Sequence, residues 1–225
     1  MALGLPLLAT PGGAHATAFE RFTLSGPGLG VANAMGADAE HVASMGYNPS
    51  ALAFQERTHF EAGVMRETGH TEAASGRSEP SRTLYLHDAY ATFRRPDSPL
   101  GYGLGLNRPF RMDSDYTGEF SSPGAATRTE LDLVNLQPTA AYRLRPGLAV
   151  SAGANYYRAL DFEYSSVAPG GGEIRRRGDG AGWGGTVGLQ FWREGWSAAV
   201  TYTSGADLTL RGENLSGNTF RLPGR

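Results

Sequence analysis

The sequence predicts an all-β protein, an antiparallel transmembrane β-barrel that begins with a small N-terminal helical plug. The clearest sign is the stretch 134–164, where apolar residues alternate with small or polar ones on both sides of a turn at 145–147. A period of two gives each strand one apolar face and one polar face. The second run keeps this period for about seventeen residues, whereas soluble strands usually have about five or six. Strands this long with a single apolar face are typical of a barrel wall that crosses a bilayer.

Composition agrees with this fold class and excludes several others. The chain has 225 residues, 40% of them hydrophobic, and no run of about eighteen apolar residues that a transmembrane helix would need. The net charge of -2 and the absence of a basic stripe give no reason to expect nucleic acid. The absence of cysteine removes disulfides, thiolate metal sites and a cysteine nucleophile.

The first 16 residues predict a signal peptide. A short apolar segment is followed by a Pro/Gly break and by Ala14-His15-Ala16, which fits the small-x-small site of signal peptidase. The positively charged start of such a peptide is missing, so we expect a truncated signal in 1–16. The alternative is an unstructured terminus.

Residues 17–56 do not alternate and predict the plug. They are rich in Gly, Ala and Ser, and we expect a short helix over 37–45, where Asp38 and Glu40 suit the positive end of the helix dipole. Asn48 and Pro49 follow, and proline biases the residue before it away from helix. We therefore expect Asn48-Pro49 to fix the turn that anchors the plug to the wall.

Residues 57–225 predict the wall, with about seven alternating strands. Short turns at 96–99, 145–147 and 193–195 alternate with long polar loops at 68–82, 112–126 and 165–179. This is the layout of a barrel in the outer membrane of a Gram-negative bacterium, with the short turns in the periplasm. The alternative is a large soluble meander or sandwich. The expected strands cover 58–67, 83–94, 100–110, 128–144, 148–164, 182–191 and 196–211.

At this point the chain resembles a known family, the long-chain fatty acid outer-membrane transporters of the FadL type. The segment 22–54 resembles their plug in its opening Ser25-Gly26-Pro27-Gly28 and in Asn48-Pro49-Ser50, where Ser50 replaces the usual Ala. The stretches LGYGLGLNRPF, LDLVNLQPTAAYRLRPGLAVSAGANYY and WGGTVGLQF are similar to the third to sixth strands of that family. The family has a fourteen-stranded barrel, so the resemblance implies that this chain holds the N-terminal half.

The resemblance implies passive uptake of long-chain fatty acids or other hydrophobic molecules by a monomer in outer-membrane lipid, without a cofactor. In that family the ligand leaves sideways into the membrane through a gap at a kink in the third strand. Asn107, Arg108 and Pro109 lie in the matching strand, and proline cannot donate a hydrogen bond to a sheet. We expect a break in the wall here, unless Pro109 simply ends the strand.

Further residues are candidates for ligand contact. Phe19 and Phe22 would line a pocket or pack beneath the plug. A buried fatty-acid carboxylate needs a cationic or hydrogen-bonding partner, and Arg158 interrupts the apolar face of its strand. The alternative is that Arg158 only reaches toward the membrane interface. The arginines at 175–177 would lie in a loop near anionic headgroups.

Enzyme readings have little support. His59 and His87 could meet on neighbouring strands, but no nucleophile motif accompanies them, and we predict no catalytic residue. A metal site from His59, Glu61 and His87 lacks a ligand spacing signature, and we predict none. The remaining alternatives are a structural or adhesive surface barrel that transports nothing and, with less support, an outer-membrane lipid enzyme.

Overall fold

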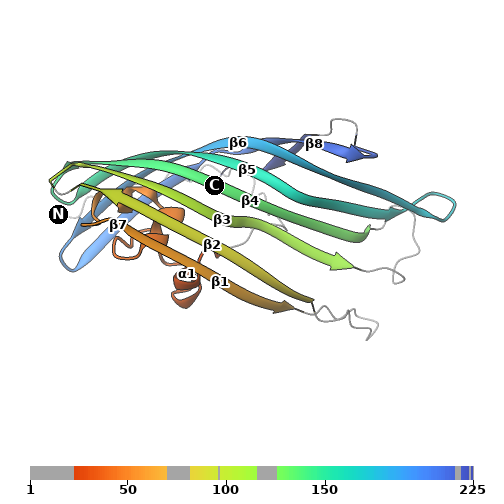
Figure 1. Cartoon of the computed structure of the whole chain (residues 1–225), viewed down its shortest axis with the longest axis horizontal. Coiled ribbons are helices and arrows are strands. Elements are labelled where there is room, and N and C mark those ends of the chain that lie inside the picture. The colour runs from red at the N-terminus through yellow and green to blue at the C-terminus, as the bar shows by residue number, and fades with distance from the viewer. Residues whose placement is uncertain are drawn as a thin grey trace, which may run out of the picture.

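The computed structural model describes residues 23–69, 82–95, 97–115, 126–215, 219–222 and 224. Within these residues nine antiparallel strands form one curved sheet, and three short helices lie against one face of it (Figure 1). We call that face the inner face. The strands pair in chain order from β1 to β6, followed by β8 and β9, and β7 also pairs with β6. The strands are β1 His59–Gly69, β2 Arg82–Arg94, β3 Leu100–Asp115, β4 Ala126–Arg145, β5 Leu148–Val167, β6 Glu173–Arg193, β7 Trp196–Thr203, β8 Ala206–Glu213 and β9 Thr219–Leu222.

The helices are α1 Gly26–Gly30 and two 3-10 helices, η1 Val42–Gly46 and η2 Pro49–Ala53. Together with the turns between them they form the plug, residues 23–58. The Ser25 hydroxyl accepts a hydrogen bond from the amide of Gly28 at 3.1 Å, which satisfies one of the free donors at the start of α1. None of the helices in the described part of the chain has the length and hydrophobicity needed to cross a membrane.

The helix predicted over 37–45 is wrong, because only Val42–Gly46 is helical there. Asp38 turns back on its own backbone instead. Its carboxylate accepts the amide of Glu40 at 2.8 Å and pairs with His41 Nδ1 at 2.6 Å. Such a local bond to the amide two residues on competes with helix formation.

The turns and loops agree with the prediction in part. Gly147 and Gly195 adopt φ of 77° and 86° in the short β4–β5 and β6–β7 turns, a conformation that favours glycine. The long loop predicted over 165–179 is wrong, because β5 continues to Val167 and β6 begins at Glu173. Arg175 therefore lies on a strand, where it faces Glu163 of β5 at 2.7 Å.

The outer face of the sheet is apolar and much of the inner face is polar, which is the reverse of a soluble protein. On β3 the outer face exposes Leu104 and Leu106, while Gly105 and Asn107 are buried on the inner face. On β4 the outer band runs from 134 to 144, which matches the about 9–11 residues that a membrane-spanning strand needs. Asp132, the next outward residue of β4, is charged. Large hydrophobic side chains of this outer band include Phe60, Val64, Phe93, Tyr102, Tyr142, Trp183, Val187, Leu189, Val200 and Tyr202.

The seventh predicted strand is two strands in the structure. Thr203 pairs with Thr186 of β6, and Thr209 pairs with Ala181. Six steps along β7 and β8 therefore lie opposite five steps along β6. This extra residue at the β7–β8 junction exchanges the faces. A single alternating strand over 196–211 would place Leu208 on the same face as Tyr202, and this is wrong, since Leu208 is buried and Tyr202 is exposed. The strand β9 was not predicted.

The inner face has an apolar patch at each end. The plug packs against one, through Met45 and Leu52 of the plug and Tyr90 and Ala141 of the wall. The other lies beyond the plug, and we call it the inner cluster. Its buried members are Phe110, Leu131, Leu133, Tyr157, Ala159, Ala206, Leu208, Leu210, Leu215 and Leu222.

Glycine on β3 gives the plug room to approach the wall. A Cβ added to Gly101 would lie 2.8 Å from the carbonyl oxygen of Leu52, which is backbone and cannot move aside cheaply. We expect Gly101→Val to displace the plug and to lower the free energy of unfolding by about 1–3 kcal/mol, the usual effect of overpacking. Gly69→Val is the matched control, because a Cβ there meets nothing within 4 Å. Urea unfolding of the protein refolded in detergent measures both, and equal midpoints would contradict close packing at Gly101.

Candidate functional site

Asn48 joins the plug to the wall. Its side-chain oxygen accepts the amide of Ser50 at 3.1 Å and so caps η2, while Nδ2 donates to the carbonyl of Gly36 at 3.0 Å. The same Nδ2 reaches the side chain of Gln190 on β6 at 3.4 Å, and Gln190 in turn donates to the carbonyl of Ala37 at 2.8 Å. Because Asn48 is fully buried, losing these bonds would leave buried polar atoms without partners.

Ser50, which departs from the family pattern, has a matching partner on the wall. Its hydroxyl lies 2.9 Å from the hydroxyl of Ser151 on β5. The polar side chain of the plug is thus accommodated by a polar side chain at the facing wall position.

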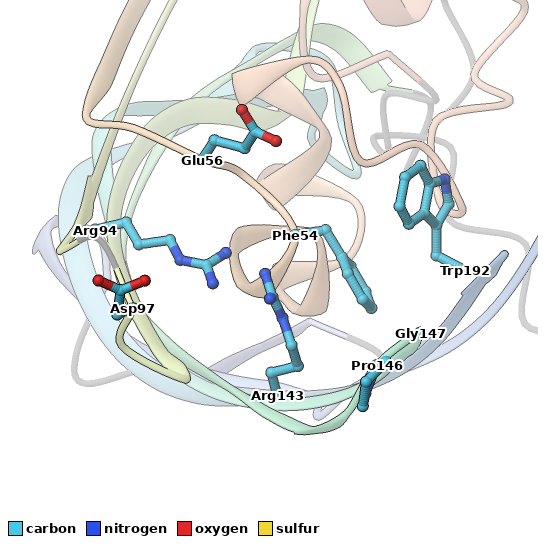
Figure 2. A pocket seen from close by; sticks show the side chains of 8 residues that line it. All are labelled: Phe54, Glu56, Arg94, Asp97, Arg143, Pro146, Gly147 and Trp192. Carbon is cyan, nitrogen blue, oxygen red and sulfur yellow. The ribbon is translucent and has the colours of Figure 1, made fainter. Parts of the chain in front are cut away.

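Two arginines hold the end of the plug. Arg143 Nε on β4 donates to the carbonyl oxygen of Ala53 at 3.0 Å, and Arg94 on β2 donates to the same oxygen and to that of Gln55 at 2.6 Å. The two guanidinium groups point toward one another into a pocket of about 430 Å³ (Figure 2). Phe54 borders the pocket, its ring centroid 5.9 Å from that of Trp192.

This pocket opens beside the short β4–β5 turn. Its lining includes Glu56 and Asp97, which balance the two arginines in formal charge. Both arginines are also engaged with plug carbonyls. The two arginines therefore tether the plug and do not form a free anion-binding site.

A row of hydrogen-bonded polar side chains crosses the inner face between the plug and the inner cluster. Asn135 Nδ2 donates to the side-chain oxygens of Asn107 at 3.4 Å and Asn155 at 3.2 Å. Asn155 donates to Thr186 at 2.7 Å, and the hydroxyl of Thr186 lies 3.1 Å from that of Thr203. We call these five residues, on β3 to β7, the polar girdle. All five are buried.

The wall is interrupted where the girdle meets β3. The ladder between β2 and β3 ends at the pair Ala89 and Leu106, although both strands continue. On the other side, the pairing of β3 with β4 shifts between Asn107 and Phe110. Figure 1 shows β3 turning away from β2 toward its C-terminal end.

Pro109 does not end its strand, since β3 continues to Asp115. Three steps along β3, from Asn107 to Phe110, face two steps along β4, so β3 carries one extra residue. Pro109 and Phe110 are consecutive and both buried, as expected where a bulge interrupts the alternation. Phe110 belongs to the inner cluster.

The outer side of the break carries an ionic cluster. Asp132 of β4 forms ion pairs with Arg108 and, at 3.2 Å, with Arg111. Arg111 also donates to the carbonyl oxygen of Tyr85 on β2 at 3.4 Å. A guanidinium from β3 thus reaches β2 in the region where no ladder joins the two strands.

The remaining predicted site residues are not brought together. Arg158 lies on the outer face and pairs with Asp179 of β6, so it does not reach the lumen. Phe19 and Phe22 lie outside the described residues, as does the predicted signal peptide 1–16.

The two histidines of the metal alternative are also apart. His87 pairs with Val64 on β1, and His59 lies five residues from Val64 along that strand. Among the described residues, no group of three or more His, Asp or Glu side chains is placed to hold a metal ion.

Sequence reasoning missed three polar residues of the inner face. Asn135 and Asn155 occupy the polar positions of alternating strands, a signal that was present but not distinctive. Asp88 lies in the expected strand 83–94, where apolar and polar residues alternate poorly, and so its face could not be assigned from the sequence. In the structure Asp88 is 4% exposed on the inner face, and neither of its carboxylate oxygens has a hydrogen-bond partner among the described residues.

A lipid-type outer band, a polar inner girdle and an internal plug define a class of protein, the plugged β-barrels of the outer membrane. The family described as "Outer membrane protein transport protein (OMPP1/FadL/TodX)" matches residues 7–169, and the chain belongs to this family. The predicted family, the antiparallel barrel fold and the outer-membrane location are thereby confirmed, and the family is one of transport proteins rather than enzymes.

Similar proteins extend further than this chain. It is 25% identical over 178 residues to outer membrane protein P1 of Haemophilus influenzae, which covers 68% of the chain and 38% of that protein. A FadL homologue of Pseudomonas aeruginosa has the same fold, with a TM-score of 0.65 at 15% identity over 85% of the chain and 55% of that structure. The toluene transporter TbuX of Ralstonia pickettii gives a TM-score of 0.59 at 16% identity, over 85% and 61%. The chain thus spans about two fifths of the curated relatives it matches.

The arginine tether leads to a prediction about the plug. Arg143→Met removes the hydrogen bonds to Ala53, and bonds to a charged group contribute about 1.5–3 kcal/mol each. We expect the amides of 49–56 to exchange hydrogen at least tenfold faster, measured by mass spectrometry on the protein in detergent. Arg145→Met is the control, since Arg145 is exposed at the end of the same strand. Unchanged exchange in Arg143→Met would show that Arg94 suffices as the tether.

Proposed function

We propose that this chain supplies the plug and part of the wall of an outer-membrane channel for passive uptake of hydrophobic compounds, which leave sideways at the break in β3. The observation that carries the proposal is the end of the β2–β3 ladder at Ala89 and Leu106. The open ladder begins where the apolar outer band ends at Leu106, and backbone polar groups without a partner cost free energy wherever lipid or protein covers them. An open ladder at this place is therefore costly and suggests a use.

The inner side of the break supports the same proposal. Phe110 and Leu133 pair across β3 and β4 directly beside Pro109, and both belong to the inner cluster. A hydrophobic ligand gains about 25 cal/mol for each Å² of apolar surface that it removes from water. A hydrophobic ligand held at the inner cluster would thus lie next to the break, and the apolar outer band begins with Leu106 on the other side.

The names of similar proteins indicate the substrate class. TbuX is described as a toluene transporter, and CymD, with a TM-score of 0.55 at 15% identity, is described as a monoaromatic hydrocarbon channel. We propose hydrophobic small molecules as the cargo, with long-chain fatty acids as the member that the family resemblance suggests. We also propose that the full-length protein is a monomer surrounded by outer-membrane lipid.

The alternative is a structural or adhesive barrel without transport. The many buried contacts of the plug with the wall would serve either function. An unpaired stretch of β2 and β3 beside an apolar cluster favours transport, because a purely structural wall would gain stability from a complete ladder.

Removing the bulge tests the proposal. Deletion of Pro109 brings the rungs Asn107–Asn135 and Phe110–Leu133 into continuous register and leaves the other residues on their present faces. We expect the initial rate of labelled toluene uptake, by cells that lack their own transporter and express the complete reading frame, to fall at least tenfold.

The control is Pro138→Ala, which changes a proline of β4 where the ladder with β3 is continuous, opposite Leu104. It should take up toluene at the wild-type rate. A folded Pro109 deletion that transports normally would remove the sideways route, and a wild-type protein without uptake of toluene or oleate would favour the structural alternative.

A further inference from the structure

Two polar side chains stand at the inner lip of the break with unused hydrogen-bonding groups. Asp88 of β2 is 4% exposed, and both its carboxylate oxygens lack partners among the described residues. Asn107 of β3 is 1% exposed, and its Nδ2 makes no hydrogen bond of normal geometry there, although it lies near the hydroxyl of Tyr90. Buried polar groups are nearly always paired, so each of these atoms calls for an explanation.

The register places the two side chains opposite each other. The last rung between β2 and β3 joins Ala89 to Leu106, and the next would join Asp88 to Asn107. Both face inward: Tyr90, two residues from Asp88, donates its hydroxyl to the carbonyl of Leu24 in the plug, and Asn107 accepts from Asn135 of the polar girdle. They therefore flank the inner side of the place where the wall opens.

A glycine on β1 makes room for the side chain of Asp88. Gly63 of β1 pairs with Asp88, and a Cβ added to Gly63 would lie 2.9 Å from the carboxylate oxygen Oδ1. A larger residue would press on the carboxylate. Glycine therefore lets the carboxylate lie over the backbone of β1.

The free groups are complementary to a hydroxyl. The carboxylate of Asp88 only accepts hydrogen bonds and the Nδ2 of Asn107 only donates, whereas a hydroxyl group does both. We infer that Asp88 and Asn107 form a polar subsite for the hydroxyl group of a neutral hydrophobic ligand at the break in β3. This inference rests on the proposed transport function and narrows its substrate class to small alcohols and phenols with an apolar body.

The charges around the subsite disfavour a carboxylate ligand. Glu61 of β1 also faces inward, where it accepts the amide of Ala43 at 3.4 Å, and so adds a second acidic group to Asp88. Arg94 and Arg143 are occupied at the carbonyl of Ala53. A carboxylate beside Asp88 would meet like charge at low dielectric, where repulsion is strong.

Three ligands with one carbon skeleton test the subsite: benzyl alcohol, toluene and benzoate. Their dissociation constants are measured with the full-length protein in detergent by isothermal titration calorimetry. We expect wild type to bind benzyl alcohol more tightly than toluene, and Asp88→Leu to reduce that preference about tenfold, the effect of losing a hydrogen bond to a charged group. Asp88→Asn, which removes the charge but keeps an acceptor, should strengthen benzoate binding.

The control is His87→Leu, which changes the neighbouring exposed residue on the outer face and should leave all three constants unchanged. Asn107→Leu is the second test of the subsite and should lower the same preference if Asp88→Leu does not fold. An unchanged ratio of benzyl alcohol to toluene in folded variants would overturn the subsite. Uptake measured in parallel separates the two proposals. If the cells take up toluene but the ratio of the benzyl alcohol and toluene dissociation constants is the same in the variants, the subsite is wrong and the transport proposal stands. If the variants change that ratio but the cells take up nothing, the transport proposal alone is wrong.

Discussion

The backbone edge that β2 and β3 leave unpaired beyond Ala89 and Leu106 is the constraint on which the surrounding structure depends. This edge begins where the apolar outer band gives way to Arg108 and Asp132, and backbone groups there that lipid or protein covers need partners from within the protein. Arg111 supplies one by donating to the carbonyl of Tyr85 across the opening, and Asp132 holds Arg111 in place. The ionic cluster on the outer face is thus explained by the backbone it completes.

The same interruption organises the inner face. The bulge at Pro109 turns Phe110 inward, so the polar girdle ends at Asn107 and the inner cluster begins one residue beyond the bulge. On the side of the girdle away from the inner cluster, Gly101 lets the plug reach the wall, and Arg143 holds the plug by the carbonyl of Ala53. Plug, girdle and cluster therefore follow one another along the strands, and the opening lies at the boundary between the last two.

Sequence reasoning found the strands, the plug and the unusual third strand, because these depend on local alternation and on a proline without a donor. It failed where a single residue changes the register. The extra residue between Thr203 and Thr209 moves Leu208 to the inner face, and an alternating pattern cannot show on which side of such a shift a residue falls. Arg158 was placed correctly on the apolar face of its strand, and its pairing with Asp179 on the outer face favours the alternative of an interface residue over a ligand partner.

The polarity on the two sides of the opening bears on how a passive channel would release its cargo. By the proposed route, a ligand that leaves the inner cluster would pass Asn107 and Asp88 on the inside and Arg108 and Asp132 on the outside. Burying one CH₂ group contributes about 0.8 kcal/mol. The inner cluster and the surroundings of the outer band are both apolar, so a ligand that moves from one to the other keeps its CH₂ groups out of water and its hydrophobic free energy changes little. Neither end traps the ligand. The concentration gradient alone would then set the direction, and the polar lips would act on selectivity and rate.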